Sequence, residues 1–141
     1  MKIFGIGTDI VNIKRIKKTL SSRNNKFKRR IFSESEINYC EKKKNPSSFY
    51  AKRFAAKEAF SKALGTGIRK GINFKDIEIS NDNNGKPFIK LKGTTAIFLK
   101  RKIKNKKYSI HLSLSDDIPW LPSTRLLSIM MPTMSLLPLA I

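Results

Sequence analysis

The stretch that decides the fold is RFAAKEAFSKALGTG, residues 53–67. Pro46 precedes it and Gly65 follows its last apolar residue, so the pattern predicts a long helix that begins at Pro46 and ends at Gly65. Alanines recur through this interval and permit close packing against another element. Glu58 and Lys62 are four residues apart and share one helix face, either as an ordinary surface ion pair or as part of a site.

Composition limits the class of protein. The 141 residues suffice for one domain with its own core. Lys and Arg number 30 against 10 Asp and Glu, a net charge of +20. We therefore expect an anionic partner or substrate: a nucleic acid, an acidic protein, a phosphorylated small molecule or a membrane surface. Cys40 is the only cysteine, which excludes an internal disulfide framework and fits the reducing cytoplasm.

The residues on either side of the long helix predict an α+β fold. A strand is expected before it, with close backbone approaches at Gly5 and Gly7. A capping box at Ser33 opens a short helix. Four strands and about four helices result. Strands are expected at 3–11, 74–80, 87–92 and 108–115, and helices at 12–22, 34–43, 46–65 and 94–105.

Four segments carry candidate chemistry. Asp9 stands in an apolar strand, which is costly unless the carboxylate is paired or binds a metal; a surface or capping aspartate is the simpler interpretation. Backbone N–H groups at Gly65-Thr66-Gly67 could approach a phosphate. Lys86 lies beside a predicted hairpin turn and could reach a phosphate too. His111 is the only histidine and is expected on one face of a strand, where either a structural or a functional role is open.

In combination, order and spacing, these segments resemble the holo-[acyl-carrier-protein] synthase family of small bacterial 4′-phosphopantetheinyl transferases. The resemblance covers about residues 1–120. It rests on GIGTDIV (5–11) with Arg15, RFAAKEA (53–59) with Lys62, NGKP (84–87) and HLSLSD (111–116). It implies the 4′-phosphopantetheinyl transferase fold, in which a small antiparallel sheet packs against the long helix. It also implies a homotrimer with its sites between subunits.

The same resemblance implies an activity. Members transfer the 4′-phosphopantetheine group of coenzyme A to a serine of apo acyl carrier protein, releasing adenosine 3′,5′-bisphosphate, in fatty-acid biosynthesis. By resemblance, Asp9 and Glu58 bind Mg²⁺, and Glu58 and Lys62 are catalytic. The proton acceptor is expected to be either Glu58 or a metal-bound water. The expected coenzyme A contacts are Lys62, Gly65, Thr66, Lys86, Pro87 and His111, and carrier-protein docking falls to Arg15 and Lys18. No specific nucleic acid and no membrane partner is expected.

Residues 121–141 depart from the family pattern and read as an atypical apolar tail. Pro122, Pro132 and Pro138 oppose the family's final strand, and a changed reading frame near codon 120 would explain the departure. The last 16 residues are mostly apolar, yet a bilayer span needs roughly 20. Three alternatives remain open: an inactive carrier-protein-binding copy, a basic nucleic-acid-binding protein, and a Mg²⁺-dependent phosphohydrolase.

Overall fold

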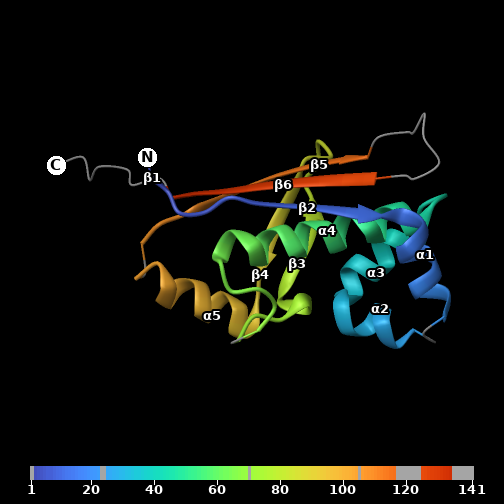
Figure 1. Ribbon diagram of the computed structural model, residues 1–141, viewed down its shortest axis with the longest axis horizontal. Coiled ribbons are helices and arrows are strands. Elements are labelled where there is room, and N and C mark those ends of the chain that lie inside the picture. Colours follow the sequence, from blue (N-terminus) through green and yellow to red (C-terminus); the bar gives the residue numbers. More distant parts are fainter. Residues whose placement is uncertain (1, 23–24, 70, 105, 117–124, 135–141) are drawn as a thin grey trace.

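A computed structural model describes residues 2–22, 25–69, 71–104, 106–116 and 125–134 of the chain (Figure 1). The elements, in order, are β1 (Lys2–Ile3), β2 (Gly7–Asn12), α1 (Ile13–Ser22), α2 (Lys26–Ile31), α3 (Glu34–Glu41), α4 (Pro46–Leu64), the 3₁₀ turn η1 (Phe74–Asp76), β3 (Ile77–Asn81), β4 (Pro87–Leu91), α5 (Gly93–Lys102), β5 (Ser109–Asp116) and β6 (Arg125–Met134). The α+β class expected from the sequence is confirmed. No helix in these ranges is both long enough and apolar enough to span a bilayer.

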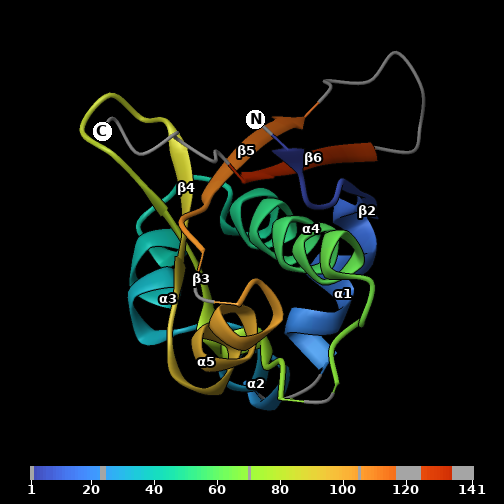
Figure 2. The same ribbon diagram turned by 90° about the vertical axis from the view of Figure 1, so that its left-hand side faces the viewer.

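The main sheet is antiparallel, and β6 lies at its centre. On one side β6 pairs with β1 and β2, and on the other side it pairs with β5. The long helix α4 packs along one face of this sheet, while β3 and β4 form a separate hairpin beside β5 (Figures 1 and 2). The expected antiparallel sheet against a long helix is therefore present.

The central strand β6 corrects one expectation from the sequence. Prolines were expected to exclude a strand in this part of the chain, yet residues 125–134 form one. Pro132 lies opposite Ile110 of β5, and on the other side of β6 the ladder passes from Ile3 in β1 to Gly7 in β2. A residue without an N–H is tolerated beside this break. Pro122 and Pro138 lie outside the described residues.

Two glycines let the strand β2 and the segment before it touch the backbone of α4. A Cβ atom added to Gly7 would lie 1.9 Å from the carbonyl oxygen of Ala59, and one added to Gly5 would lie 2.1 Å from that of Ala63. Both distances are far below van der Waals contact, so only glycine fits. The close approaches predicted at these positions are confirmed, and they fix the separation between β2 and α4.

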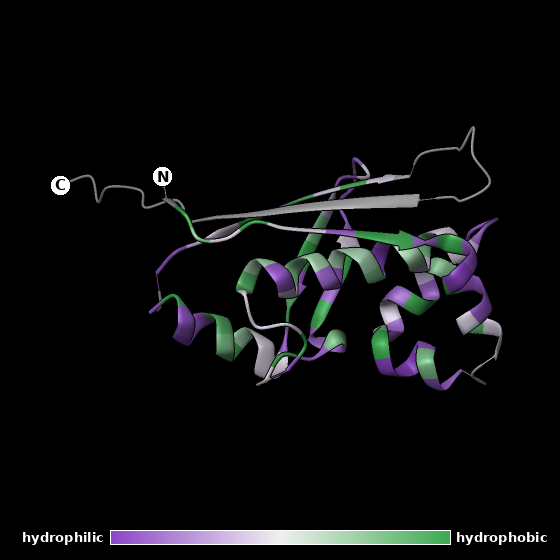
Figure 3. Cartoon of the chain, viewed as in Figure 1, coloured by the Kyte–Doolittle hydropathy of each residue, from purple (hydrophilic) through white to green (hydrophobic). Residues whose placement is uncertain are grey.

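The core falls into two apolar clusters that meet along α4. One gathers Phe60, Ile77 and Leu99 beneath the sheet and α5, and the other gathers Phe32 and Tyr50 among the first three helices. In Figure 3 hydrophobic residues recur along α4, and hydrophilic residues are frequent on α1 and α5. Because α4 contributes to both clusters, side chains on its remaining face are held on a rigid support.

Two local predictions met different outcomes, and one helix was not predicted. The capping box is confirmed, since the Ser33 side chain accepts from the Glu36 N–H and the Glu36 carboxylate accepts from the Ser33 N–H. The helix α2 was not expected. The expected strand at 74–80 begins only at Ile77, because Phe74–Asp76 form the turn η1.

Candidate active site

Asp9 and Lys62 come from different elements and form an ion pair. The Lys62 ammonium lies 2.6 Å from Oδ1 of Asp9, with side chains 52 % and 13 % exposed respectively. The aspartate in the apolar strand is therefore paired, as the cost of leaving it alone requires. An ordinary Glu58–Lys62 surface pair was one interpretation of the helix spacing, but the hydrogen-bonded partner of Lys62 is Asp9.

The charges of Asp9 and Lys62 also act on the carboxyl group of Glu58. Its pKa is raised above the usual value, chiefly because the carboxyl group is partly buried, and further because the negative charge of Asp9 is close. The positive charge of Lys62 works in the opposite direction. Two carboxylates that lie near each other provide a favourable setting for a bound cation.

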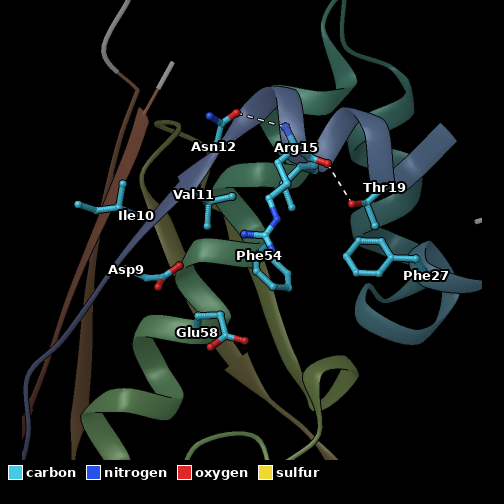
Figure 4. A pocket seen from close by; sticks show the side chains of 10 residues that line it. Asp9, Ile10, Val11, Asn12, Arg15, Thr19, Phe27, Phe54 and Glu58 are labelled. Atoms are coloured by element: carbon cyan, nitrogen blue, oxygen red, sulfur yellow. Dashed lines mark hydrogen bonds between the residues drawn. The ribbon is translucent and has the colours of Figure 1, made fainter. Parts of the chain in front are cut away.

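Asp9 and Glu58 line one cleft of about 570 Å³. In Figure 4 the two carboxylates lie near each other on β2 and α4, and Arg15 reaches down from α1 into the same cleft. The rings of Phe27 and Phe54 complete its apolar wall. Asn12 caps the start of α1 by accepting from the Arg15 N–H at 3.2 Å, which places Arg15 directly after the strand that carries Asp9.

A second depression, of about 670 Å³, also reaches Glu58. Its cationic lining residues are Arg30, Arg69 and Lys75, and Phe74 contributes an apolar wall. Glu58 thus stands between two depressions. Sequence reasoning missed this second one because its lining residues are scattered between positions 30 and 76 and share no motif.

The other predicted residues divide into two groups. Gly65 ends α4 with a φ of 72°, and the Thr66 hydroxyl donates to the Gly67 carbonyl, so both follow Lys62 at one end of the helix. Lys86 is exposed in the β3–β4 turn, and Pro87 begins β4.

His111 lies on β5, where its Nε2 is 3.3 Å from Oγ of Ser109. In the described part of the chain, neither depression beside Glu58 is lined by His111, Lys86 or Pro87. Lys18 is exposed on α1, outside the cleft lining. One chain therefore brings together Asp9, Glu58, Lys62 and Arg15, while the hairpin turn and His111 lie apart from them.

The two carboxylates fit a magnesium ion. Hard carboxylate oxygens are the donors Mg²⁺ takes, and it commonly uses one or two of them together with water and substrate phosphate. Among the described residues no cluster of three or more His, Cys, Asp or Glu side chains occurs, so a site closed entirely by protein ligands is not formed there. The pair Asp9 and Glu58 suits an open site that a phosphorylated substrate completes.

Comparison with known proteins decides the family. A family model described as the 4′-phosphopantetheinyl transferase superfamily matches residues 5–114, most of the chain. The chain belongs to this superfamily. As a phosphopantetheinyl transferase it is an enzyme, and the alternative of a basic nucleic-acid-binding protein gives way to it.

Curated relatives refine this membership. The chain is 50 % identical over 117 residues to the holo-[acyl-carrier-protein] synthase of Pelagibacter ubique, covering 83 % of this chain and 90 % of that protein. It is 49 % identical over 117 residues to the synthase of Aliivibrio fischeri, with the same coverage. The transferase accordingly has the activity of this group, which is transfer of 4′-phosphopantetheine from coenzyme A to apo acyl carrier protein.

Solved structures agree with the fold. The crystal structure of holo-[acyl-carrier-protein] synthase from Neisseria meningitidis matches with a TM-score of 0.81 and 35 % identity, covering 94 % of this chain and 99 % of that one. The Helicobacter pylori synthase, solved in complex with coenzyme A, matches with a TM-score of 0.73 and 37 % identity, covering 91 % and 99 %. The recognisable fold therefore extends beyond residue 120 of the transferase.

Proposed function

We propose that the transferase carries out its reaction at the cleft between β2 and α4, with Asp9 and Glu58 as the Mg²⁺ ligands. The observation that carries this proposal is one cleft lined by Asp9, Glu58 and Arg15, with Lys62 held at Asp9 by an ion pair. When bound, Mg²⁺ neutralises pyrophosphate charge during transfer. The residues of the chain supply the remaining functions.

Lys62 is the cation that we assign to the pyrophosphate. Its side chain is half exposed and is held at Asp9, so its ammonium can turn toward a substrate phosphate without first leaving a buried site. A positive charge placed there stabilises the negative charge that develops on the leaving phosphate. Removing it should therefore lower the rate constant of transfer more than it weakens coenzyme A binding.

Glu58 is our candidate for the proton acceptor of the acceptor serine. Its carboxylate lines the cleft, and a carboxylate placed beside an attacking hydroxyl can accept the proton of that hydroxyl. It also lies between the two depressions, so coenzyme A on one side and the carrier-protein serine on the other can both reach it. The reaction releases adenosine 3′,5′-bisphosphate from coenzyme A.

The homotrimer is the second part of the proposal. Register places Ile10 of β2, Ser115 of β5 and the intervening residue of β6 side by side on one face of the sheet. His111 shares that face, because alternate residues of a strand point the same way. Ile6 and Ile10 are 53 % and 61 % exposed. Large apolar side chains exposed on a sheet face favour an interface, so we propose that a second copy of the chain covers this face.

This arrangement gives the separated residues a role. Within one chain Lys86, Pro87 and His111 lie apart from the carboxylate cleft. Across a subunit boundary they can bind the nucleotide half of coenzyme A together with Gly65 and Thr66 of the neighbouring copy. The exposed Lys86 side chain would then supply positive charge for the adenosine 3′-phosphate.

Carrier-protein docking is assigned to α1. Arg15 lies both on this basic helix and in the cleft, and Lys18 is exposed one turn further along. An acidic carrier protein attracted to α1 would therefore present its serine beside Glu58.

Cys40 is fully buried and unpaired, which fits a reducing compartment, and we place the enzyme in the cytoplasm.

The experiment is to incubate the full chain with Mg²⁺, coenzyme A and apo acyl carrier protein, and then to weigh the acceptor. A mass gain equal to phosphopantetheine is expected, and Asp9→Asn or Glu58→Gln should lower its rate by about 100-fold or more. A folded chain that adds no mass yet still binds the carrier would be an inactive copy. Phosphate release from coenzyme A without acceptor would instead support the phosphohydrolase.

A further inference from the structure

Lys57 is a fully buried lysine in the middle of α4, directly before Glu58. Its ammonium donates three hydrogen bonds. The acceptors are Oε2 of Glu36 at 2.7 Å, the Phe74 carbonyl at 2.8 Å and the Ile31 carbonyl at 3.0 Å. All three donor positions of the ammonium are therefore used. Burial of this charge is costly without such partners, and none of the roles proposed for the active site uses it.

Two of the three acceptors, the Ile31 and Phe74 carbonyls, belong to segments that line the depressions beside Glu58. Ile31 ends α2, which supplies Phe27 to the first cleft and Arg30 to the second. Phe74 lines the second depression. Its ring also stacks on Phe54, a wall of the first, with centroids 5.7 Å apart and planes inclined by 22°.

The third acceptor, Glu36, extends the connection into the rest of the fold. Its Oε2 also accepts from the Ser33 N–H at 2.9 Å, and its Oε1 accepts from the Ile79 N–H at 3.0 Å. One buried ion pair thus joins α4 to the start of α3 and to β3. Both carboxylate oxygens are occupied, so the pair has a single well-defined arrangement.

We propose that Lys57 is a positioning residue for the transfer reaction. It fixes the position of the Glu58 carboxylate relative to the walls of the two depressions. The inference rests on the role proposed above for Glu58. Neighbouring residues of a helix point about 100° apart, so fixing the Lys57 side chain fixes the rotation of α4 and the direction of Glu58. The ties to Ile31 and Phe74 keep the walls at a constant distance from that carboxylate.

The test separates positioning from stability. Lys57→Met alone would leave the Glu36 charge buried and unpaired, and the chain would be strongly destabilised. Lys57→Met with Glu36→Gln removes both charges at similar volume, so no unpaired charge stays buried. The Ile31 and Phe74 carbonyls lose their donor, so we expect this double variant to fold but to melt at a lower temperature than the wild type. Well below that temperature it should keep its KM for coenzyme A within about 3-fold and lose about 10- to 100-fold in kcat.

A local measurement accompanies the kinetics. Backbone amides of Phe74–Asp76 should exchange with solvent faster in the double variant than in the wild type, because the carbonyl tie to η1 is gone. The matched control is Lys28→Met with Glu41→Gln, a pair with an N–O distance of 2.6 Å that holds α2 to α3 without contacting a carbonyl of the cleft walls. Its kcat should stay within about 2-fold of wild type.

A wild-type kcat in the folded double variant would overturn the inference and leave only a structural role. If Lys57→Met with Glu36→Gln does not fold, Lys57→Gln with Glu36→Gln fills the site without charge. A lowered kcat in this second variant supports the inference, and a wild-type kcat overturns it. Wild type and Glu58→Gln are run alongside. Undiminished transfer by Glu58→Gln would overturn the proposed role of Glu58 together with this inference, whereas an impaired Glu58→Gln beside a fully active double variant overturns the inference alone.

Discussion

Replacing Gly7 by alanine should separate the two carboxylates of the active site. Gly7 precedes Asp9 by two residues, and the α4 carbonyl that its Cβ would meet belongs to Ala59, the residue after Glu58. The added Cβ would lie 1.9 Å from that oxygen, whereas ordinary van der Waals contact begins at 3.4 Å. The obstacle is helix backbone, which has no alternative rotamer. The strand must therefore move away from the helix by about 1.5 Å.

Two effects of different size follow from this displacement. Overpacking of this kind costs about 1–3 kcal/mol of stability, so Gly7→Ala should still fold but melt at a lower temperature. A displacement of about 1 Å between catalytic groups can cost about 100-fold in rate. The transfer rate per folded molecule should therefore fall by about two orders of magnitude, measured by mass analysis of the carrier protein at a temperature well below the melting point.

Gly5→Ala is the matched comparison. Its Cβ would lie 2.1 Å from the Ala63 carbonyl oxygen, a clash of nearly the same severity but one turn further from Glu58. We expect a similar loss of stability and a smaller loss of rate. Equal rates for Gly7→Ala and the wild type, in proteins shown to be folded, would refute the reasoning that the glycine contact sets the distance between Asp9 and Glu58.

Three further predictions concern charge, docking and assembly. Burial raises the pKa of Glu78, but hydrogen bonds from Lys92, Ser35 and Ser33 outweigh it and lower the pKa from 4.5 to about 2. The ionised Glu78 side chain therefore contributes on the order of 3 kcal/mol to the free energy of unfolding. This contribution is present above pH 4.5 and is lost as the pH falls toward 2. Glu78→Gln should flatten this acid loss in urea unfolding at about pH 2.5 and pH 6; an unchanged pH dependence would contradict the assignment. Arg15→Glu should raise the KM for the carrier protein at least 10-fold through charge reversal and leave coenzyme A binding intact; a parallel loss of both would argue against docking at α1. Ile10→Lys should convert the proposed trimer to monomers in sedimentation analysis and abolish transfer, and a monomeric wild type would remove the basis for a shared site.

Local sequence signals predicted the elements that depend on nearby residues. The capping box at Ser33, the turn before Lys86 and the helix ending at Gly65 all satisfy their own backbone groups within a few positions. For such elements the sequence contains the physical cause. The juxtaposition of Asp9 with Glu58 was available only through resemblance, because the two residues are 49 positions apart in the chain and the contact of strand and helix depends on glycine packing.

Elements that depend on distant partners were missed. The helix α2 follows a left-handed Asn25 and consists largely of cations, so neither propensity nor charge marked it. Strand β6 contains a proline that the register accommodates only because β1 and β2 meet beside it. Lys57 looked like any helical lysine; its burial depends on acceptors 17 to 26 residues away. The hypothesis of a changed reading frame near codon 120 stays open, and translating the gene in its other frames tests it.

The position of β6 also has a consequence for how the enzyme is made. Gly7 pairs with Met130, so the strand that bears Asp9 finds its neighbour only after more than a hundred further residues have left the ribosome. Until then β2 and β5 have no strand between them to complete their ladders. Such long-range pairing slows folding and leaves strand edges open to other chains. In cells the yield of active enzyme should therefore depend on protection of the nascent chain as much as on the stability of the finished fold.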